Sequence, residues 1–208
     1  ESCHYLEKKG YDVKYLEVNQ EGFIDLKEFE QLLKAKKSLV SIMHTNNEIG
    51  VVQPTEQIAL MCDLYKSIYH CDAAQTFSWN SLDVKKNAIH AVSISGHKFY
   101  APKGIGALYI KRNVKNILKP LIDGGGQEQG LRSGTLATPL VVGLGKAADM
   151  TLKNHIRYYE HYMRMQQYLI SKLKSENIDY KVNGSLKYRS VNNLNISIAN
   201  LPSSQLIM

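Results

Sequence analysis

Polar side chains follow three short apolar runs of this sequence, at the points where strands of a parallel sheet would end. Residues 44–47 (His-Thr-Asn-Asn) follow the first run, Asp72 follows the second with Gln75 three residues later, and residues 95–98 (Ser-Gly-His-Lys) follow the third. The carboxyl ends of parallel strands share one edge of a sheet, where α/β proteins bind ligands. A single strand-end carboxylate is more often a helix cap than a catalytic group, so the prediction rests on the whole set.

Together these residues meet the requirements of pyridoxal 5'-phosphate (PLP). This cofactor needs a lysine amine for a Schiff base, a carboxylate that keeps its pyridine nitrogen protonated, and hydrogen-bond donors for its phenolic oxygen and its phosphate. Lys98 could supply the amine and Asp72 the carboxylate. The remaining positions would fall to Asn47 and Gln75 at the phenolic oxygen and to Ser95 and His97 at the phosphate.

Alternating strand-like and helix-like segments would position this set. Short apolar runs typical of buried strands occupy residues 38–43, 68–71, 91–94 and 106–110, and residues 13–18 alternate like a further strand. Amphipathic segments predict helices over residues 25–34, with Asp25 as the cap, and over residues 54–66, with Pro54 in the first turn. We therefore predict an α/β fold with a mostly parallel central sheet and flanking helices.

The pattern changes after Thr138. One or two long helices are predicted over residues 139–173, and residues 193–198 alternate like a strand. We interpret the bulky residues of this helical region as packing groups: Tyr158, Tyr159, Tyr162, Tyr168, Leu169 and Leu173. We expect a large ligand-binding domain over residues 1–150 and the beginning of a smaller α+β domain over residues 151–208. Both ends of the chain resemble cut points, so we expect an internal fragment.

Composition narrows the possible functions. The sequence has 26 Lys and Arg against 19 Asp and Glu, but its positive charges are scattered, so we expect a solvated surface and no nucleic-acid partner. No apolar run approaches the roughly 18 residues of a membrane span, so no membrane partner is expected. Cys3, Cys62 and Cys71 are an odd number without a C-x-x-C pair, which indicates neither a disulfide framework nor a metal site. Cys62 and Cys71 fall inside a helix and a strand, so we expect both to be buried.

Six segments of the chain resemble the group I (NifS/IscS-type) cysteine desulfurases of the class V aminotransferase family. They are SIMHTNNEIG (41–50), HCDAAQ (70–75), SISGHK (93–98), GGGQE (124–128), RSGT (132–135) and TPLVVGLG (138–145), in the family's order. The resemblance implies a PLP-dependent enzyme of fold type I. Such an enzyme removes sulfur from L-cysteine, giving L-alanine and a protein-bound persulfide for iron–sulfur cluster assembly.

The resemblance also assigns a role to each site residue. It implies that Lys98 is the catalytic Schiff-base residue and that Asp72 pairs with the pyridine nitrogen. It places Asn47 and Gln75 at the ring substituents, Ser95 and His97 at the phosphate, and Thr135 at the phosphate of a neighbouring subunit's cofactor. The family is therefore expected to be a homodimer. By resemblance its further partners are an iron–sulfur scaffold protein, frataxin and a small helical accessory protein, in a mitochondrion or mitochondrion-derived organelle. Bacterial cytoplasm is the alternative compartment.

Some positions depart from the family pattern. Residues 76–83 replace a Gly-Lys pair and Pro-Ile-Asp, Ala101 replaces a glycine, and Gln129 stands where arginine is customary. The resemblance also implies a phosphate loop, a substrate-carboxylate arginine and a catalytic-cysteine loop, all expected outside this chain. Two other functions stay open: another fold-type-I PLP enzyme, such as an aminotransferase or selenocysteine lyase, or a non-catalytic paralogue that acts as a binding module.

Overall fold

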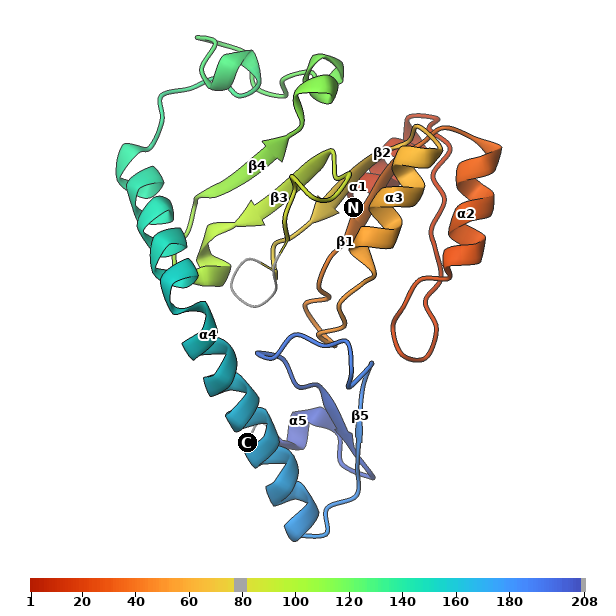
Figure 1. Cartoon of the computed structure of the whole chain (residues 1–208), viewed down its shortest axis with the longest axis vertical. Helices are drawn as coiled ribbons and strands as arrows, with labels where there is room; N and C mark the ends of the chain where they lie inside the picture. The colour runs from red at the N-terminus through yellow and green to blue at the C-terminus, as the bar shows by residue number, and fades with distance from the viewer. Residues whose placement is uncertain (77–81, 207–208) are drawn as a thin grey trace.

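A computed structural model describes residues 1–76 and 82–206 of the chain (Figure 1). Its centre is a four-stranded sheet in the order β1-β2-β3-β4. The strands are β1 (Leu39–Met43), β2 (Ile68–Asp72), β3 (Ala91–Ser95) and β4 (Gly106–Ile110). The first three are parallel and β4 runs antiparallel to β3. The four apolar runs are therefore strands, as predicted. The fold is α/β, and its sheet is mixed, with three parallel strands and one antiparallel strand.

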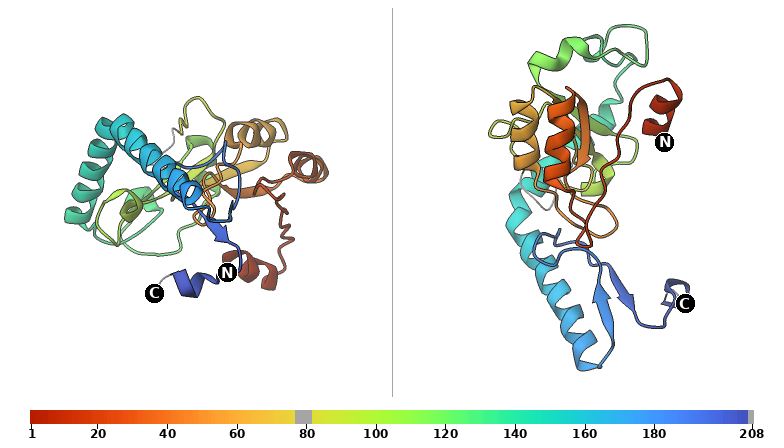
Figure 2. Two further views of the ribbon diagram at one scale, coloured as in Figure 1. Left: turned by 90° about the horizontal axis from the view of Figure 1, so that it is seen from below. Right: turned by 90° about the vertical axis from the view of Figure 1, so that its right-hand side faces the viewer.

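Two helices cover one face of this sheet (Figures 1 and 2). These are α2 (Leu26–Ala35) and α3 (Thr55–Leu64), close to their predicted positions. Asp25 caps α2 by accepting hydrogen bonds from the backbone N–H groups of Lys27 and Glu28, at 2.7 and 3.3 Å. The remaining helices are α1 (Ser2–Lys8), α4 (Thr138–Ser175) and α5 (Ser203–Leu206), with 3₁₀ turns η1 (Gly96–Phe99), η2 (Arg112–Ile117) and η3 (Glu128–Gly130).

The main hydrophobic core lies between the sheet and these two helices. Tyr69 and Cys71 alternate with polar neighbours along β2 and are fully buried, as are Ile58 and Cys62 of α3. Period-two alternation sends the apolar side chains of β2 to the helices and its polar side chains to the other face. Burying a side chain such as Ile58 stabilises the fold by about 1.5–3 kcal/mol. This core fixes the ends of the strands that carry the candidate site.

The predicted strand over residues 13–18 is wrong. Its single pairing among the described residues is an isolated bridge between Val18 and Ile24, and the side chains of Tyr15 and Val18 are exposed. Alternation predicts a strand only where a neighbouring strand can accept its hydrogen bonds, and this segment packs Leu16 against the core without pairing with a strand of the sheet.

The region after residue 137 begins with one long helix. α4 has 38 residues, and beyond it β5 (Tyr180–Val182) pairs antiparallel with β6 (Ile196–Ile198). The predicted strand over 193–198 is therefore present but shorter. The first half of α4 runs beside η1, and the second half extends past the sheet alongside β5 (Figure 1). Residue 150 lies inside this continuous helix, so the division into two domains stays a prediction.

The interpretation of the α4 tyrosines and leucines as packing groups is wrong for three of them. Tyr159, Tyr168 and Leu169 are exposed by 42%, 60% and 44%, whereas Leu173 is buried. The second half of α4 lies beside the small β5–β6 sheet on one side (Figure 2). No helix in the described part of the chain is long and apolar enough to cross a membrane.

The burial of His44 predicts how the stability of the fold depends on pH. Burial lowers the pKa of His44 from its usual 6.5 to about 4, so acid must protonate it preferentially in the unfolded state. The stability of the fold should be unaffected above pH 6.5 and should fall by up to about 3 kcal/mol as the pH decreases to 4. Urea unfolding of the wild type and of His44→Gln between pH 4 and 8 measures this slope. The variant should be flatter, while His161→Gln, at an exposed histidine, should retain the wild-type slope.

Candidate active site

A cavity of about 230 Å³ opens at the carboxyl edge of the parallel strands. Four predicted site residues line it: Asn47, Asp72, Gln75 and Lys98. Met43, Thr45 and Ala74 complete its wall. Parallel pairing of β1 with β2 and of β2 with β3 brings these segments together from positions more than 50 residues apart. The strand-end reasoning therefore located the cavity and the residues with amine, carboxylate and amide groups inside it.

Asp72 is the last residue of β2, and one of its carboxylate oxygens is held in place. Oδ1 accepts a hydrogen bond from the backbone N–H of Ala74 at 2.9 Å and another from Ser93 Oγ at 3.4 Å. Within residues 1–76 and 82–206, no ion pair includes Asp72 and no hydrogen bond reaches its other oxygen, Oδ2. The carboxylate is thus oriented by the protein and still has an oxygen for a ligand in the cavity.

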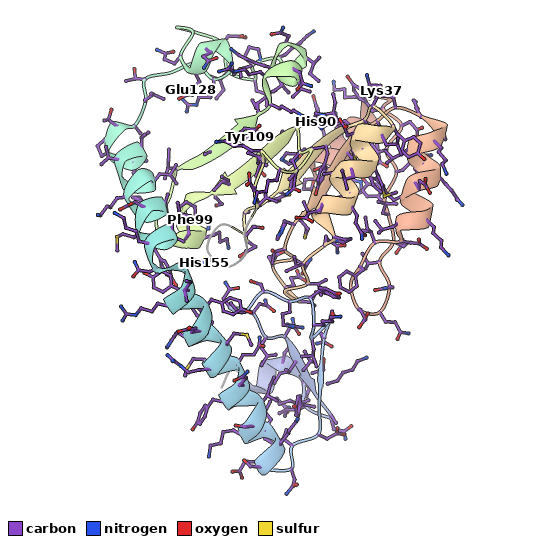
Figure 3. The ribbon with its side chains drawn as sticks, in the orientation of Figure 1. Lys37, His90, Phe99, Tyr109, Glu128 and His155 are labelled. Carbon is purple, nitrogen blue, oxygen red and sulfur yellow. The ribbon has the colours of Figure 1, made fainter. Side chains whose placement is uncertain are left out.

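Lys98 projects from η1, a turn whose backbone is packed tightly. A Cβ on Gly96 would lie 2.8 Å from the carbonyl oxygen of Ile105 and 2.9 Å from the Leu144 side chain, so only glycine fits there. Phe99 is buried where η1 meets α4 (Figure 3). Ala101, which replaces a glycine of the family pattern, packs in the same cluster without disrupting it. Lys98 therefore combines a tightly packed backbone with an exposed side chain.

Three predicted site residues lie outside the cavity wall. Ser95 Oγ and His97 Nδ1 are 3.2 Å apart and form a pair directly before Lys98. Thr135 is exposed in the segment between η3 and α4. Their roles at a phosphate stay predictions, and exposure of Thr135 is compatible with a site on a neighbouring subunit. The departure from the family pattern at residues 76–83 falls largely on residues 77–81, outside the described residues.

The loop that carries Asn47 is held by the C-terminal region. Asn46 Oδ1 accepts from the backbone N–H groups of Glu48 and Ile49, both at 2.9 Å, which closes the turn. Asn193 Nδ2 then donates to the carbonyl oxygen of Glu48 at 3.0 Å, and Asn195 Nδ2 donates to the same oxygen at 3.2 Å. The position of Asn47 in the cavity thus depends on residues almost 150 positions later.

Arg189 supports this contact through its bonds to Asn193. It is buried, and its guanidinium donates to the carbonyl oxygens of Asn183, Ser185 and Asn193 and to Asn193 Oδ1. A planar guanidinium with five donors can satisfy several carbonyl groups at once. Sequence reasoning missed Arg189, Asn193 and Asn195. The asparagine-rich run 192–195 was a usable signal, because asparagine is depleted in strands and bonds readily to backbone.

The two cysteines near the sheet are buried, as predicted. Burial raises the pKa of the Cys62 thiol to about 12 and that of the Cys71 thiol to about 11. Both are therefore protonated at neutral pH, and a protonated thiol is a poor nucleophile. In the described part of the chain no group of three or more His, Cys, Asp or Glu side chains could hold a metal ion.

Comparison with known proteins agrees with this geometry. The family model described as aminotransferase class-V matches residues 2–207. The chain belongs to the class-V aminotransferase family. Within this family it is 42% identical, over its whole length, to "Cysteine desulfurase, mitochondrial" of Arabidopsis thaliana. It is 49% identical over 90% of its length to "Cysteine desulfurase, mitosomal" of Trachipleistophora hominis.

A solved structure of this aminotransferase family has the same fold. The NifS-like protein superposes on 98% of the chain with a TM-score of 0.91 and 36% sequence identity. The α/β fold is therefore that of the NifS-like, fold-type-I members of the family. The chain covers 55% of that structure and 46% and 42% of the two relatives, so it spans about half of their length.

The burial of the cysteines predicts how they react. In the native protein, Cys62 and Cys71 should react with an aromatic disulfide reagent at pH 8 at least roughly 100-fold more slowly than in denaturant, because the native structure excludes the reagent and keeps both thiols protonated. Mass spectrometry of peptides after timed labelling measures both rates, with the denatured protein as the control. Labelling of Cys71 in the native protein at the denatured rate would contradict the burial of this thiol.

Proposed function

We propose that the chain is the PLP-binding core of a cysteine desulfurase, an enzyme that takes sulfur from L-cysteine and yields L-alanine and a protein-bound persulfide. The observation that carries the proposal is the shared cavity of Lys98, Asp72, Asn47 and Gln75. One amine, two amides and one carboxylate, whose Oδ2 has no hydrogen bond within residues 1–76 and 82–206, are groups that suit the ring of PLP. The names of the relatives support the choice of substrate.

The site residues would divide among four parts of the cofactor. Lys98 would hold PLP covalently through Nζ. Asp72 Oδ2 would accept a hydrogen bond from the protonated pyridine nitrogen. Asn47 and Gln75 would donate to the phenolic oxygen. Ser95 and His97 would bind the phosphate, joined by Thr135 of a neighbouring subunit, which makes the active form a homodimer. When bound, PLP supplies an electron sink for the bonds at the substrate's α-carbon.

The residues of the chain would set the protonation states that this chemistry needs. A carboxylate makes a charge-assisted hydrogen bond to a protonated ring nitrogen, and such bonds are about twice as strong as neutral ones. Asp72 would therefore keep that nitrogen protonated. Lys98 Nζ, the amine of the described cavity wall, would carry a proton to or from the substrate's α-carbon.

The thiol that accepts sulfur would be a cysteine other than Cys62 and Cys71. Persulfide formation needs a thiolate that can reach the substrate, and burial keeps both of these thiols protonated and fixed. The persulfide would supply iron–sulfur cluster assembly, with a scaffold protein, frataxin and a small accessory protein as partners. The mitochondrial and mitosomal names of the relatives support an organelle as the compartment, with a bacterial cytoplasm as the alternative.

Lys98 predicts where the cofactor attaches. In the full-length protein, Lys98→Ala should abolish the yellow absorbance of bound PLP after dialysis, because no other amine of the described cavity wall can replace it. Borohydride reduction of the wild type followed by peptide mass spectrometry should find PLP on Lys98. Lys103→Ala is the matched control and should retain the cofactor. Recovery of PLP on Lys103 would refute the assignment, and a wild type that binds no PLP would favour a non-catalytic binding module.

The proposed role of Asp72 predicts how much turnover depends on its negative charge. Asp72→Asn should leave some PLP bound but lower turnover of L-cysteine at least roughly 100-fold, because a neutral amide cannot stabilise the protonated ring nitrogen as a carboxylate does. Alanine release measured at saturating PLP separates this loss from weaker cofactor binding. Asp83→Asn, at an exposed carboxylate outside the cavity, should behave as the wild type. Near-normal turnover of Asp72→Asn would remove Asp72 from the site.

A further inference from the structure

A chain of polar side chains crosses the sheet on the face opposite α2 and α3. Ser41 Oγ lies 2.9 Å from His70 Nδ1, and His70 Nε2 lies 3.2 Å from Ser93 Oγ. Ser93 Oγ donates to Asp72 Oδ1 at 3.4 Å. The register explains the contacts, because Ser41 pairs with His70 and Asp72 pairs with Ser93, while His70 and Asp72 are two residues apart on β2. We call these four residues the relay.

The chemistry of the side chains fixes the direction of the relay. An ionised carboxylate only accepts hydrogen bonds, so the Ser93 hydroxyl must donate its hydrogen bond to Asp72. Ser93 Oγ can then only accept from His70, which requires the proton of His70 to be on Nε2. The unprotonated Nδ1 of His70 accepts in turn from the Ser41 hydroxyl. Every donor of the relay therefore points towards Asp72.

The charge state of His70 is compatible with this direction. Burial lowers the pKa of His70 and outweighs the opposite effect of the Asp72 charge, so the imidazole is neutral at neutral pH. A neutral imidazole has one donor and one acceptor nitrogen, as the relay requires.

The relay ends on one oxygen of Asp72. Oδ1 receives both the Ser93 hydroxyl and the Ala74 N–H, so rotation of the carboxylate would break two hydrogen bonds together. Oδ2 is thereby kept for a ligand in the cavity. His70 itself does not line the cavity, so it can act on a ligand only through Ser93 and Asp72.

We propose that His70 is a positioning residue, which as the Nε2–H tautomer holds Ser93 and through it orients the Asp72 carboxylate towards the pyridine nitrogen. The proposal rests on the proposed function, because it takes PLP as the ligand of Asp72. A purely structural role would be satisfied by any side chain that fills the space on this face. A positioning role requires a donor at the place of Nε2, and it disappears when Asp72 can no longer act as a carboxylate.

The first test reads the tautomer directly. The full-length protein without cofactor is labelled with ¹⁵N-histidine, and long-range ¹H–¹⁵N NMR spectra at pH 7.5 report which ring nitrogen carries the proton. The expected result is Nε2–H for His70, with resonance assignment by the His70→Gln variant. A protonated ring or an Nδ1–H tautomer would overturn the proposal. This measurement needs no PLP, so it is independent of the proposed function.

The second test measures PLP affinity in a double-mutant cycle. His70→Leu and Ser93→Ala should each weaken PLP binding about 10-fold, whereas His70→Gln, whose amide can donate in place of Nε2, should stay within about 3-fold of the wild type. In an Asp72→Asn background the His70→Leu change should cost less than about 2-fold, because its effect passes through the carboxylate. An equal loss in both backgrounds would identify His70 as merely structural and overturn the proposal.

The control is a second histidine of the same sheet. His90 lies beside the start of β3 (Figure 3), and its Nδ1 accepts from the backbone N–H of Tyr69 at 3.2 Å. Asp72 is at the other end of β2, where it pairs with Ser93. His90→Gln should leave PLP affinity unchanged even if it lowers the melting temperature. If the wild type binds no PLP at all, the proposed function fails and the role of His70 falls with it. Normal PLP binding with no effect of His70→Leu would refute the role of His70 alone.

Discussion

The parallel pairing of β1, β2 and β3 is the constraint on which the rest of the molecule depends. It continues past the strand ends, where the His44 N–H donates to the Asp72 carbonyl at 2.9 Å and the Ala73 N–H donates to the Ser93 carbonyl at 3.0 Å. These bonds place three chain segments side by side as they leave the sheet. The cavity is the space that they enclose: the first segment contributes the Asn47 amide, the second the Asp72 carboxylate and the Gln75 amide, and the third the Lys98 amine. A shift of one residue in register would turn Asp72 to the other face.

The same pairing gives the sheet two faces with different tasks. Tyr69 and Cys71 point towards α2 and α3 and stabilise the fold by apolar burial. His70 and Asp72 point to the other side, where hydrogen bonds and charge decide what the residues can do. A strand of five residues therefore serves the core and the site at once. This explains why the site is rigid: moving Asp72 would require moving Cys71, which is packed without exposed surface.

The sequence alone was sufficient for the features that local pattern determines. Strands β1 to β4, helices α2 and α3 and the four residues of the cavity wall follow from apolar runs, a capping aspartate and polar strand ends. The predicted strand over residues 13–18 and the packing of Tyr168 failed because both depend on whether another element lies alongside. The relay was not foreseen for the same reason: Ser41 and Ser93 are 29 and 23 positions from His70, and only the register of the folded chain brings them into contact. The partners of Arg189 are four to six positions away, but most of them are backbone carbonyl groups, which the pattern of side chains does not reveal.

The hydrogen bonds between the C-terminal region and the Asn47 loop show that the sheet alone does not position every residue of the site. Two backbone bonds join the segments: Val52 N–H to the Tyr188 carbonyl and Ser190 N–H to the Gly50 carbonyl, at 2.9 and 2.8 Å. Gly50 permits this approach, since a Cβ there would lie 2.6 Å from Asn193 Oδ1. Asp72 and Lys98 can be positioned once the sheet forms, but Asn47 reaches its place only after α4 has returned the chain to the loop. Contacts of such sequence separation are costly in loop entropy and form late, so the cavity would be completed last.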